Sequence, residues 1–206
     1  MKKTFIYIWM LLGIHAFTGC NNSPGDLGYR VTCTVDNTLH RDSATLMVLE
    51  EDYNRLRVCG ACRSSDGVFT FTGQTDGPKA ALIRWDNDTT QPFYFVLEPG
   101  QLDINITASS WNITGSPHSA EYQRYINQRN EIMDLRVATW QEYLKMATDS
   151  SLKRDDEIHM VRQDSLLNDS LQRITVERIN RGDAVGRIIR ERFGNQLDKE
   201  HMRQLK

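Results

Sequence analysis

Short runs of alternating apolar and polar residues fill the first half of the chain. At residues 102–108, Leu102, Ile104 and Ile106 alternate with polar residues, which is the two-residue period of a half-buried strand. Other runs of similar length, bounded by turn residues, lie at residues 29–35, 44–49, 55–58, 68–72, 80–85 and 93–97. About seven or eight strands at this spacing predict an antiparallel β-sandwich or open barrel over residues 27–115.

Two of these runs predict which side chains face the core. In residues 29–35 every second side chain is apolar, and Cys33 belongs to this inward set. In the run that begins at Arg55, the apolar Leu56 and Val58 are predicted to point inward. The turn residues around Gly67 then predict a hairpin between this run and residues 68–72.

The hydrophobic period changes after Gly115. Ser116 is a residue type that caps helix N-termini, and Pro117 suits the first helical position because its missing amide hydrogen is not needed there. Apolar residues then recur every three or four positions as far as Ala147, which predicts one long amphipathic helix. Trp140 lies on this apolar stripe and is therefore predicted to be a core residue.

A second helical pattern follows and completes the fold prediction. Its stripe includes Ile158 and Val161, and it ends near Asn180. Short helices are expected over residues 183–193 and 198–205. The whole chain is therefore predicted to be α+β, with a C-terminal helical hairpin and short helices over residues 116–206 after the sandwich.

The N-terminal residues indicate export to the cell envelope. Lys2 and Lys3 precede an apolar run that ends at Phe17, and this run is too short and too interrupted for a stable membrane span. Residues 1–19 are accordingly predicted to be a signal peptide that takes no part in the fold.

Cys20 is a candidate lipidation site. The residues Phe-Thr-Gly-Cys at positions 17–20 resemble a bacterial lipoprotein signal, in which the cysteine becomes the acylated mature N-terminus. Each buried CH₂ adds about 0.8 kcal/mol of membrane affinity, so several acyl chains would anchor the protein stably. Residues 20–26 would form a polar tether, and the protein would face the periplasm or the outer-membrane surface. A secreted protein with a free Cys20 is the alternative.

Composition and charge narrow the classes of partner. The chain has 206 residues, of which 39% are hydrophobic and 25% charged, and this is ordinary globular composition. Its formal net charge is -2, and neither half carries the cationic footprint that nucleic-acid binding requires. The expected partners are therefore the membrane, through the N-terminal lipid, and an envelope protein, with no nucleic acid.

Three segments taken together resemble a known family. They are Asp66-Gly67 ahead of Phe69 and Phe71, then Phe93-x-Phe95-x-Leu97-Glu98-Pro99-Gly100, then Thr114-Gly115-Ser116 ahead of Tyr122 and Tyr125. They resemble the uncharacterised β-rich domain, a domain-of-unknown-function family, that precedes the thioredoxin domain in TlpA-like thiol-disulfide oxidoreductase lipoproteins. The resemblance covers residues 27–125, and residues 116–206 are similar to the connecting region of that family.

The resemblance implies an accessory or interaction domain without the enzyme. In that family the redox chemistry belongs to a C-terminal domain with a Trp-Cys-x-x-Cys sequence, and no tryptophan here precedes a cysteine: Trp9, Trp85, Trp111 and Trp140 all have other neighbours. No catalytic residue is carried over, and neither a cofactor nor a metal is expected.

Cys59 and Cys62 form a Cys-x-x-Cys motif, which raises the alternative of a thiol-disulfide oxidoreductase or redox sensor. Such chemistry needs a thiolate, which these motifs usually obtain from a helix N-terminus and nearby positive charge. Here the motif lies between strand patterns, and only Arg57 and Arg63 could supply positive potential. A structural role is therefore favoured.

The pairing of the cysteines stays open at this point. Cys62 has the predicted inward parity and Cys59 the outward one, unless Gly60 forms a bulge that changes the register. A Cys33–Cys62 disulfide is then as plausible as a Cys59–Cys62 loop. Zinc would need a fourth ligand, and the candidate His40 lies in a predicted loop.

Two tryptophans give a third functional alternative. Trp85 and Trp111 lie at predicted strand ends, where they could form an aromatic platform for a glycan, although a tryptophan in such a place is more often part of the core or its rim. The favoured expectation remains a non-enzymatic envelope lipoprotein that contacts other proteins.

Overall fold

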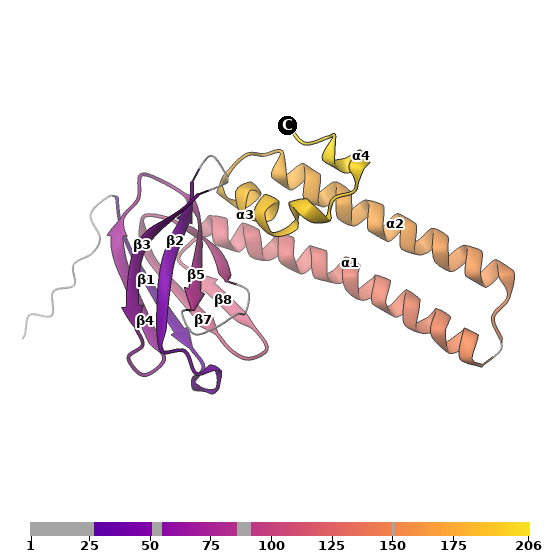
Figure 1. Cartoon of the computed structure of the whole chain (residues 1–206), viewed down its shortest axis with the longest axis horizontal. Helices are drawn as coiled ribbons and strands as arrows, with labels where there is room; N and C mark the ends of the chain where they lie inside the picture. Colours follow the sequence, from indigo (N-terminus) through magenta and orange to yellow (C-terminus); the bar gives the residue numbers. More distant parts are fainter. Residues whose placement is uncertain (1–26, 51–54, 86–91, 150) are drawn as a thin grey trace, which may run out of the picture.

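The computed structural model describes residues 27–50, 55–85, 92–149 and 151–206, so the predictions for the signal peptide, Cys20 and the tether up to residue 26 lie outside the described residues. In the described part, eight strands precede the helices (Figure 1). The strands are β1 (Gly28–Val35), β2 (Ser43–Leu49), β3 (Leu56–Arg63), β4 (Val68–Gln74), β5 (Lys79–Trp85), β6 (Phe93–Leu97), β7 (Gly100–Ile106) and β8 (Trp111–Thr114). This arrangement confirms the predicted α+β class.

The strands form two four-stranded sheets that pack as a sandwich. The first sheet has the order β4-β1-β7-β8 and the second the order β3-β2-β5-β6. Neighbouring strands are antiparallel except β1 and β7, which pair in parallel and so depart from the predicted all-antiparallel arrangement. Parallel neighbours need a long connection, and here the intervening strands β2 to β6 provide it.

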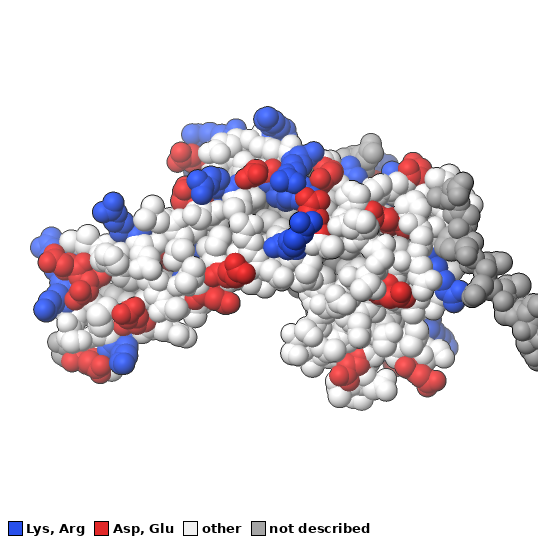
Figure 2. All heavy atoms as spheres, turned by 180° about the vertical axis from the view of Figure 1, so that it is seen from behind, with Lys and Arg blue, Asp and Glu red and all other residues white. Residues whose placement is uncertain are grey.

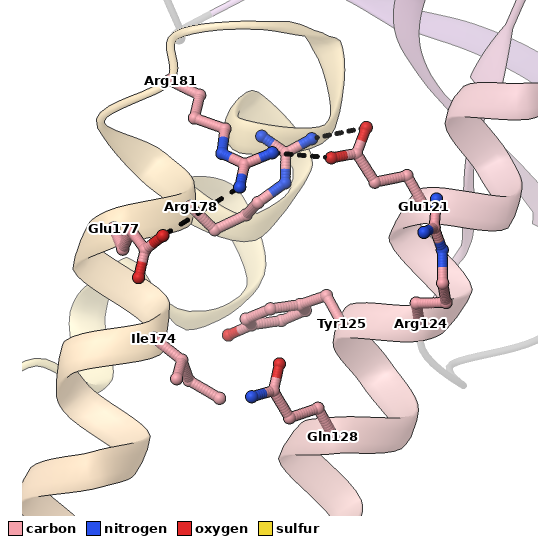
Figure 3. A pocket seen from close by; sticks show the side chains of 8 residues that line it. All are labelled: Glu121, Arg124, Tyr125, Gln128, Ile174, Glu177, Arg178 and Arg181. Atoms are coloured by element: carbon pink, nitrogen blue, oxygen red, sulfur yellow. Dashed lines mark hydrogen bonds and ion pairs between the residues drawn. The ribbon is translucent and has the colours of Figure 1, made fainter.

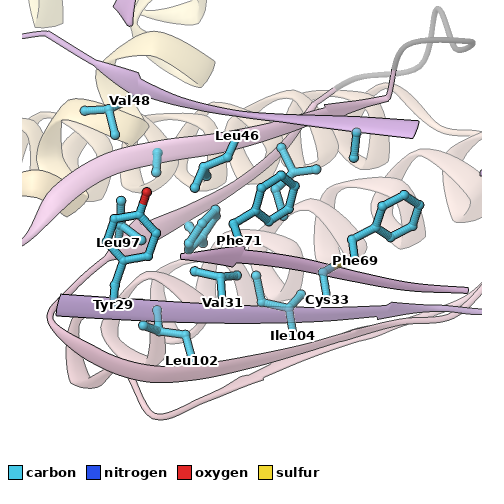
Figure 4. Close-up of a cluster of buried hydrophobic side chains, with 14 of the residues drawn as sticks. Tyr29, Val31, Cys33, Leu46, Val48, Phe69, Phe71, Leu97, Leu102 and Ile104 are labelled. Carbon is cyan, nitrogen blue, oxygen red and sulfur yellow. The ribbon is translucent and has the colours of Figure 1, made fainter. Parts of the chain in front are cut away.

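One face of each sheet builds the interior of the sandwich (Figure 4). The two-residue period places alternate side chains of each strand there, and Cys33 lies among them with no exposed surface, as predicted. The fully buried members of this core include Val31, Cys33, Ala44, Leu46, Phe69, Ala81, Ile83, Phe95 and Leu102.

Strand β3 differs from its prediction in two ways. Leu56 and Val58 are exposed, whereas the sequence pattern placed them inward. The strand also continues through Gly60, because the pairing with β2 shifts there: Leu46 lies opposite Gly60 but Met47 lies opposite Val58. Cys59 is the extra residue of this β-bulge, and the bulge turns both Cys59 and Cys62 toward the sandwich core.

The predicted hairpin between β3 and β4 is also wrong. The two strands belong to different sheets, and β4 pairs with β1 instead. The turn at Asp66 and Gly67 carries the chain from one sheet to the other along one side of the sandwich. Turn residues therefore marked the reversal correctly but could not indicate the partner strand.

Helices cover the outer face of the second sheet (Figure 1). They are α1 (Pro117–Thr148), α2 (Arg154–Ile179), α3 (Ala184–Phe193) and α4 (Lys199–Met202), with short 3₁₀ helices at Asn37–Leu39 and Gly194–Gln196. Helix α3 packs on β5 and β6, where Val185, Ile188 and Ile189 are fully buried. This helical layer forms a second core, which includes Leu82 and Val96 from the sheet.

Helices α1 and α2 form an antiparallel hairpin that is longer than the helical layer itself. The end of α1 and the start of α2 project past α3 and α4, away from the sandwich (Figure 1). Among the described residues, no helix combines the length and the apolar character needed to cross a bilayer.

Gly115, which lies directly before α1, provides a test of this geometry. Its φ is +84°, and an added Cβ would lie 2.0 Å from the carbonyl oxygen of Gln101. At Gly182 (φ +70°) an added Cβ would meet no atom within 4 Å. We therefore expect Gly182→Ala to lower the free energy of unfolding by about 1 to 2 kcal/mol, the usual cost of a left-handed residue, and Gly115→Ala to lower it by more. Urea unfolding of the two variants measures this difference, and equal losses would contradict the crowding at Gly115.

Candidate interaction site

Contacts between the first turn of α1 and the edge strand β6 fix the direction of the hairpin. We call the contacts among Val96, Glu98, Ser116, His118 and Ser119 the joint. The backbone N–H of Val96 donates a hydrogen bond to Ser119 Oγ at 3.0 Å. The Val96 carbonyl accepts a bond from Ser119 Oγ at 3.3 Å, and Ser116 Oγ lies 3.4 Å from the same carbonyl oxygen. An edge strand exposes unpaired backbone groups, and here the first turn of α1 satisfies them.

Glu98 joins the same cluster from the turn that follows β6. This buried carboxylate accepts a hydrogen bond from the Ser116 hydroxyl, and its other oxygen lies 2.5 Å from His118 Nδ1. Ser116 Oγ in turn accepts the Ser119 N–H at 2.9 Å and so caps α1. The hydroxyl donates to a carboxylate rather than to a histidine, and Ser116 is buried, so the cluster has the geometry of a structural contact and not of a nucleophile with its base.

The sequence predicted one residue of this joint, Ser116, but not the buried Glu98. The capping role of Ser116 was predicted and is confirmed by its bond to Ser119. The burial of Glu98 and its contact with His118 were not predicted, because a glutamate before Pro99 is usually a solvated turn residue. Its position between two apolar strands was the available signal.

The three described cysteines are not joined by disulfides, and the surroundings of Cys33 and Cys59 oppose a nucleophilic role. Burial, together with negative charge at Cys62, raises the pKa of Cys33 to about 12. Burial also raises the pKa of Cys59, while Arg57 acts in the opposite direction. Cys33 lies in the sandwich core and Cys62 packs against the same core, and a Cys33–Cys62 disulfide stays a prediction.

The aromatic platform proposed for a glycan is not formed by free faces of Trp85 and Trp111. Trp85 is buried against Phe69, with ring centroids 5.4 Å apart. Trp111 is half-buried and makes an edge contact with Phe93 at 5.2 Å and a stacked contact with Tyr122 at 6.2 Å. Both rings therefore serve the two cores. Across residues 27–50, 55–85, 92–149 and 151–206, no group of three or more His, Cys, Asp or Glu side chains could hold a metal ion.

A polar cleft of about 320 Å³ lies at the base of the hairpin, between α1 and α2 (Figure 3). Glu121 of α1 lies between Arg178 of α2 and Arg181 of the turn that follows it: it is 2.9 Å from Arg181 Nη1 and 3.3 Å from Arg178 Nη2. Arg178 is buried and also contacts Asp183 at 2.9 Å. The charges in this cleft thus bind one another and hold the two helices and the start of α3 together.

In the distal half of the hairpin, the half that lies far from the sandwich, a narrower line of contacts joins α1 and α2. We call this line of contacts the seam. Arg136 of α1 donates to both carboxylate oxygens of Asp164 of α2, at 2.8 and 3.2 Å. These bonds hold the pKa of Asp164 below its usual value. The Trp140 ring makes an edge contact with Tyr143, at 5.8 Å between centroids. The level of Asp164 on α2 is therefore fixed against Arg136 on α1.

Large apolar side chains are exposed along this distal half. Trp140 was predicted to be a core residue and is 43% exposed, so that prediction was wrong. Ile158 and Val161, on the predicted apolar stripe of the second helix, are 57% and 55% exposed. The physical reason is that each helix has a single neighbour here, and only the seam residues are covered. The full set of exposed large apolar residues on the two helices is Leu135, Val137, Trp140, Leu144, Ile158, Val161 and Leu166.

Five of these side chains lie on one side of the hairpin. At 3.6 residues per turn, Val137, Trp140 and Leu144 form one stripe on α1. This stripe is rotated about the helix axis away from the residues that contact α2, in the direction in which the helix turns from its N-terminus to its C-terminus. On α2, Ile158 and Val161 are rotated in the same direction about the helix axis, away from the residues that contact α1. Because the helices are antiparallel, equal rotations bring both stripes to the same side. We call these five residues the hairpin face; Leu135 lies on the opposite side.

Charge surrounds this arm unevenly. On the face shown in Figure 2, charged side chains gather at the free end of the arm and near the sandwich, and acidic side chains lie among uncharged surface between them. A shallow groove along α2 includes Ile158 and Val161 of the hairpin face, and Leu166 adds to its apolar lining. Exposed contiguous apolar surface with a polar rim is typical of protein interaction sites.

Ser119 allows a test of the joint. Ser119→Ala leaves the buried Val96 N–H without its acceptor, so we expect the free energy of unfolding to fall by about 1 to 3 kcal/mol. Ser165 is exposed within α2, and Ser165→Ala should change it by less than about 0.5 kcal/mol. Urea unfolding compares the two, and an unchanged stability for Ser119→Ala would contradict the joint.

Thiol labelling tests the cysteine environments. With its pKa raised to about 12 and no exposed surface, Cys33 should react with a thiol reagent at pH 8 only after unfolding. Cys59, which is partly exposed, should react in the folded protein but more slowly than free cysteine. Mass spectrometry of the labelled peptides separates the sites. Rapid labelling of Cys59 at pH 6 would indicate a stabilised thiolate and contradict this expectation.

Comparison with known proteins adds one finding. No curated protein and no solved structure matches the chain. The matched family covers most of the sandwich together with the start of α1, and thus contains Glu98, Ser116, Ser119 and the rest of the joint. Residues 29–122 match the family described as "Domain of unknown function (DUF4369)".

Proposed function

We propose that this chain is a lipid-anchored protein-interaction module of the bacterial cell envelope, in which the β-sandwich carries a helical hairpin that binds another protein. The hairpin face carries this proposal. Its five large apolar side chains lie on one side of a projecting arm and are exposed to water, which is unfavourable compared with burial. Burial in an interface would stabilise the complex by about 25 cal/mol for each Å² of apolar surface covered.

The rest of the structure supports a binding role because it directs the arm. Ser116, Ser119 and Glu98 fix the start of α1 against β6, and the Glu121 contacts fix α2 beside it. A preformed arm loses little conformational entropy when a partner binds, which favours recognition by a rigid surface.

The chemistry of the polar groups favours binding over catalysis. The raised pKa values of Cys33 and Cys59 keep these thiols protonated near neutral pH. The buried Glu98 is already bonded to Ser116 and His118. These groups are therefore committed to the fold, which supports a module that acts through its surface.

The envelope location in this proposal depends on Cys20 and on the likeness to the domain that precedes thioredoxin in TlpA-like lipoproteins. Acylation at Cys20 would hold the sandwich near the membrane through residues 20–26, with the arm directed at an envelope protein. The partner class is thus a protein that faces the same compartment.

Lipid labelling tests the anchor. Cells that express the full chain and take up a radiolabelled or clickable fatty acid should incorporate label into this protein, and Cys20→Ala should abolish the incorporation and move the protein from the membrane to the soluble fraction. Cys59→Ala is the matched control and should keep both label and membrane location. Equal labelling of the Cys20→Ala variant would refute the lipoprotein assignment.

Cross-linking in intact cells tests the interaction. We expect the full chain to form a protein cross-link that Val137→Glu reduces about tenfold or more, because a charge placed in an apolar interface costs several kcal/mol. Leu135→Glu provides the control, since Leu135 is 55% exposed, Val137 is 50% exposed and the two lie on opposite sides of the hairpin. Equal cross-linking by both variants would exclude the hairpin face as the binding surface.

A further inference from the structure

We infer that the partner of the hairpin face is a second copy of this chain, bound through the same face in an antiparallel two-fold dimer. This inference rests on the proposed function, since it uses the same surface. In the dimer, the distal halves of two hairpins would pack face to face as a four-helix bundle, which gives each helix the second neighbour that it lacks in one copy.

A two-fold interface must be self-complementary, and the apolar stripes meet this requirement. With α1 antiparallel to α1 of the other copy and Trp140 near the axis, Val137 of each copy lies opposite Leu144 of the other. On α2 the equivalent centre is at Val161. Asp164 bonds to Arg136, and Trp140 and Val161 each lie about one turn from that contact toward the free end of the hairpin. The two centres therefore lie at the same level, so one axis serves both helices.

The charges at the ends of the α2 stripe are also self-complementary. Arg154 lies one helical repeat before Val161 and Asp169 about one repeat after it, and both side chains are exposed. In the antiparallel dimer, Arg154 of each copy lies opposite Asp169 of the other, which gives two ion pairs related by the axis. On α1, Asp134 and Lys145 are placed in the same way, at the rim.

The parallel alternative places like charges together. If both free ends pointed the same way, α1 would face α2 of the other copy, and residues at one level of the hairpin would meet. The Arg136–Asp164 contact sets those levels: Arg154 would then lie beside Lys145, and Asp169 beside Asp134. Like charges at close range cost free energy, so the charge pattern selects the antiparallel arrangement.

The oligomeric state of the full chain in detergent micelles is the first test. Sedimentation equilibrium should show a dimer, and Val137→Glu should raise its dissociation constant about tenfold or more, while Leu135→Glu leaves it within about threefold. Circular dichroism confirms that each variant is folded. A monomer at concentrations of tens of micromolar, or equal effects of the two variants, would overturn the inference.

Charge reversal then tests the antiparallel register. Arg154→Glu and Asp169→Arg should each weaken the dimer, because each places like charges opposite one another at two equivalent positions. The double variant restores opposite charges and should recover the dissociation constant of the unchanged chain to within about threefold. Two independent losses that add in the double variant would exclude this pairing.

The two proposals fail in distinguishable ways. If the purified chain is a monomer while Val137→Glu still abolishes the cross-link in cells, the hairpin face binds a different envelope protein and only the dimer is excluded. If neither the dimer nor the cross-link depends on Val137, the interaction function is excluded as well.

Discussion

The hydrogen bonds between Val96 and Ser119 of the first turn of α1 are the contact on which the rest of this structure depends. A sheet edge and a helix start share one physical problem, because both leave backbone groups without partners. Here Ser119 satisfies the edge of β6 while Ser116 caps the helix. The buried Glu98 then orients Ser116, so that three side chains determine where the helical layer begins.

From this joint the helices change gradually from core elements to a free arm. Near the sandwich, α1 lies against β6, β8, α2 and α3, and its side chains Tyr122 and Tyr125 are buried. Farther out it contacts α2 alone, and burial is limited to the seam that includes Thr139. Apolar residues recur every three or four positions along the whole of α1. In its first half they form part of a core, and in its second half they form an exposed surface.

This explains which features could be predicted from the sequence. Period-two alternation located the strands and placed Cys33 correctly, because those residues lie between two sheets and their surroundings follow from the local pattern. Periodicity does not report how many neighbours an element has, and so Trp140 was placed in a core that ends before it reaches this residue. At Val58, a bulge at an edge strand broke the parity on which the prediction relied. Glu98 was missed because its two partners, Ser116 and His118, lie 18 and 20 residues away in the sequence.

The length of α1 gives the joint a mechanical consequence. Its 32 residues span about 48 Å at 1.5 Å per residue, so a tilt of about 5° at Ser116 would displace the far end by about 4 Å. A shift of that size is comparable to the reach of a single side chain. A small rearrangement at the start of α1 is therefore enlarged at the far end of the hairpin. The short hydrogen-bonded turn beside β6 keeps that far end in position.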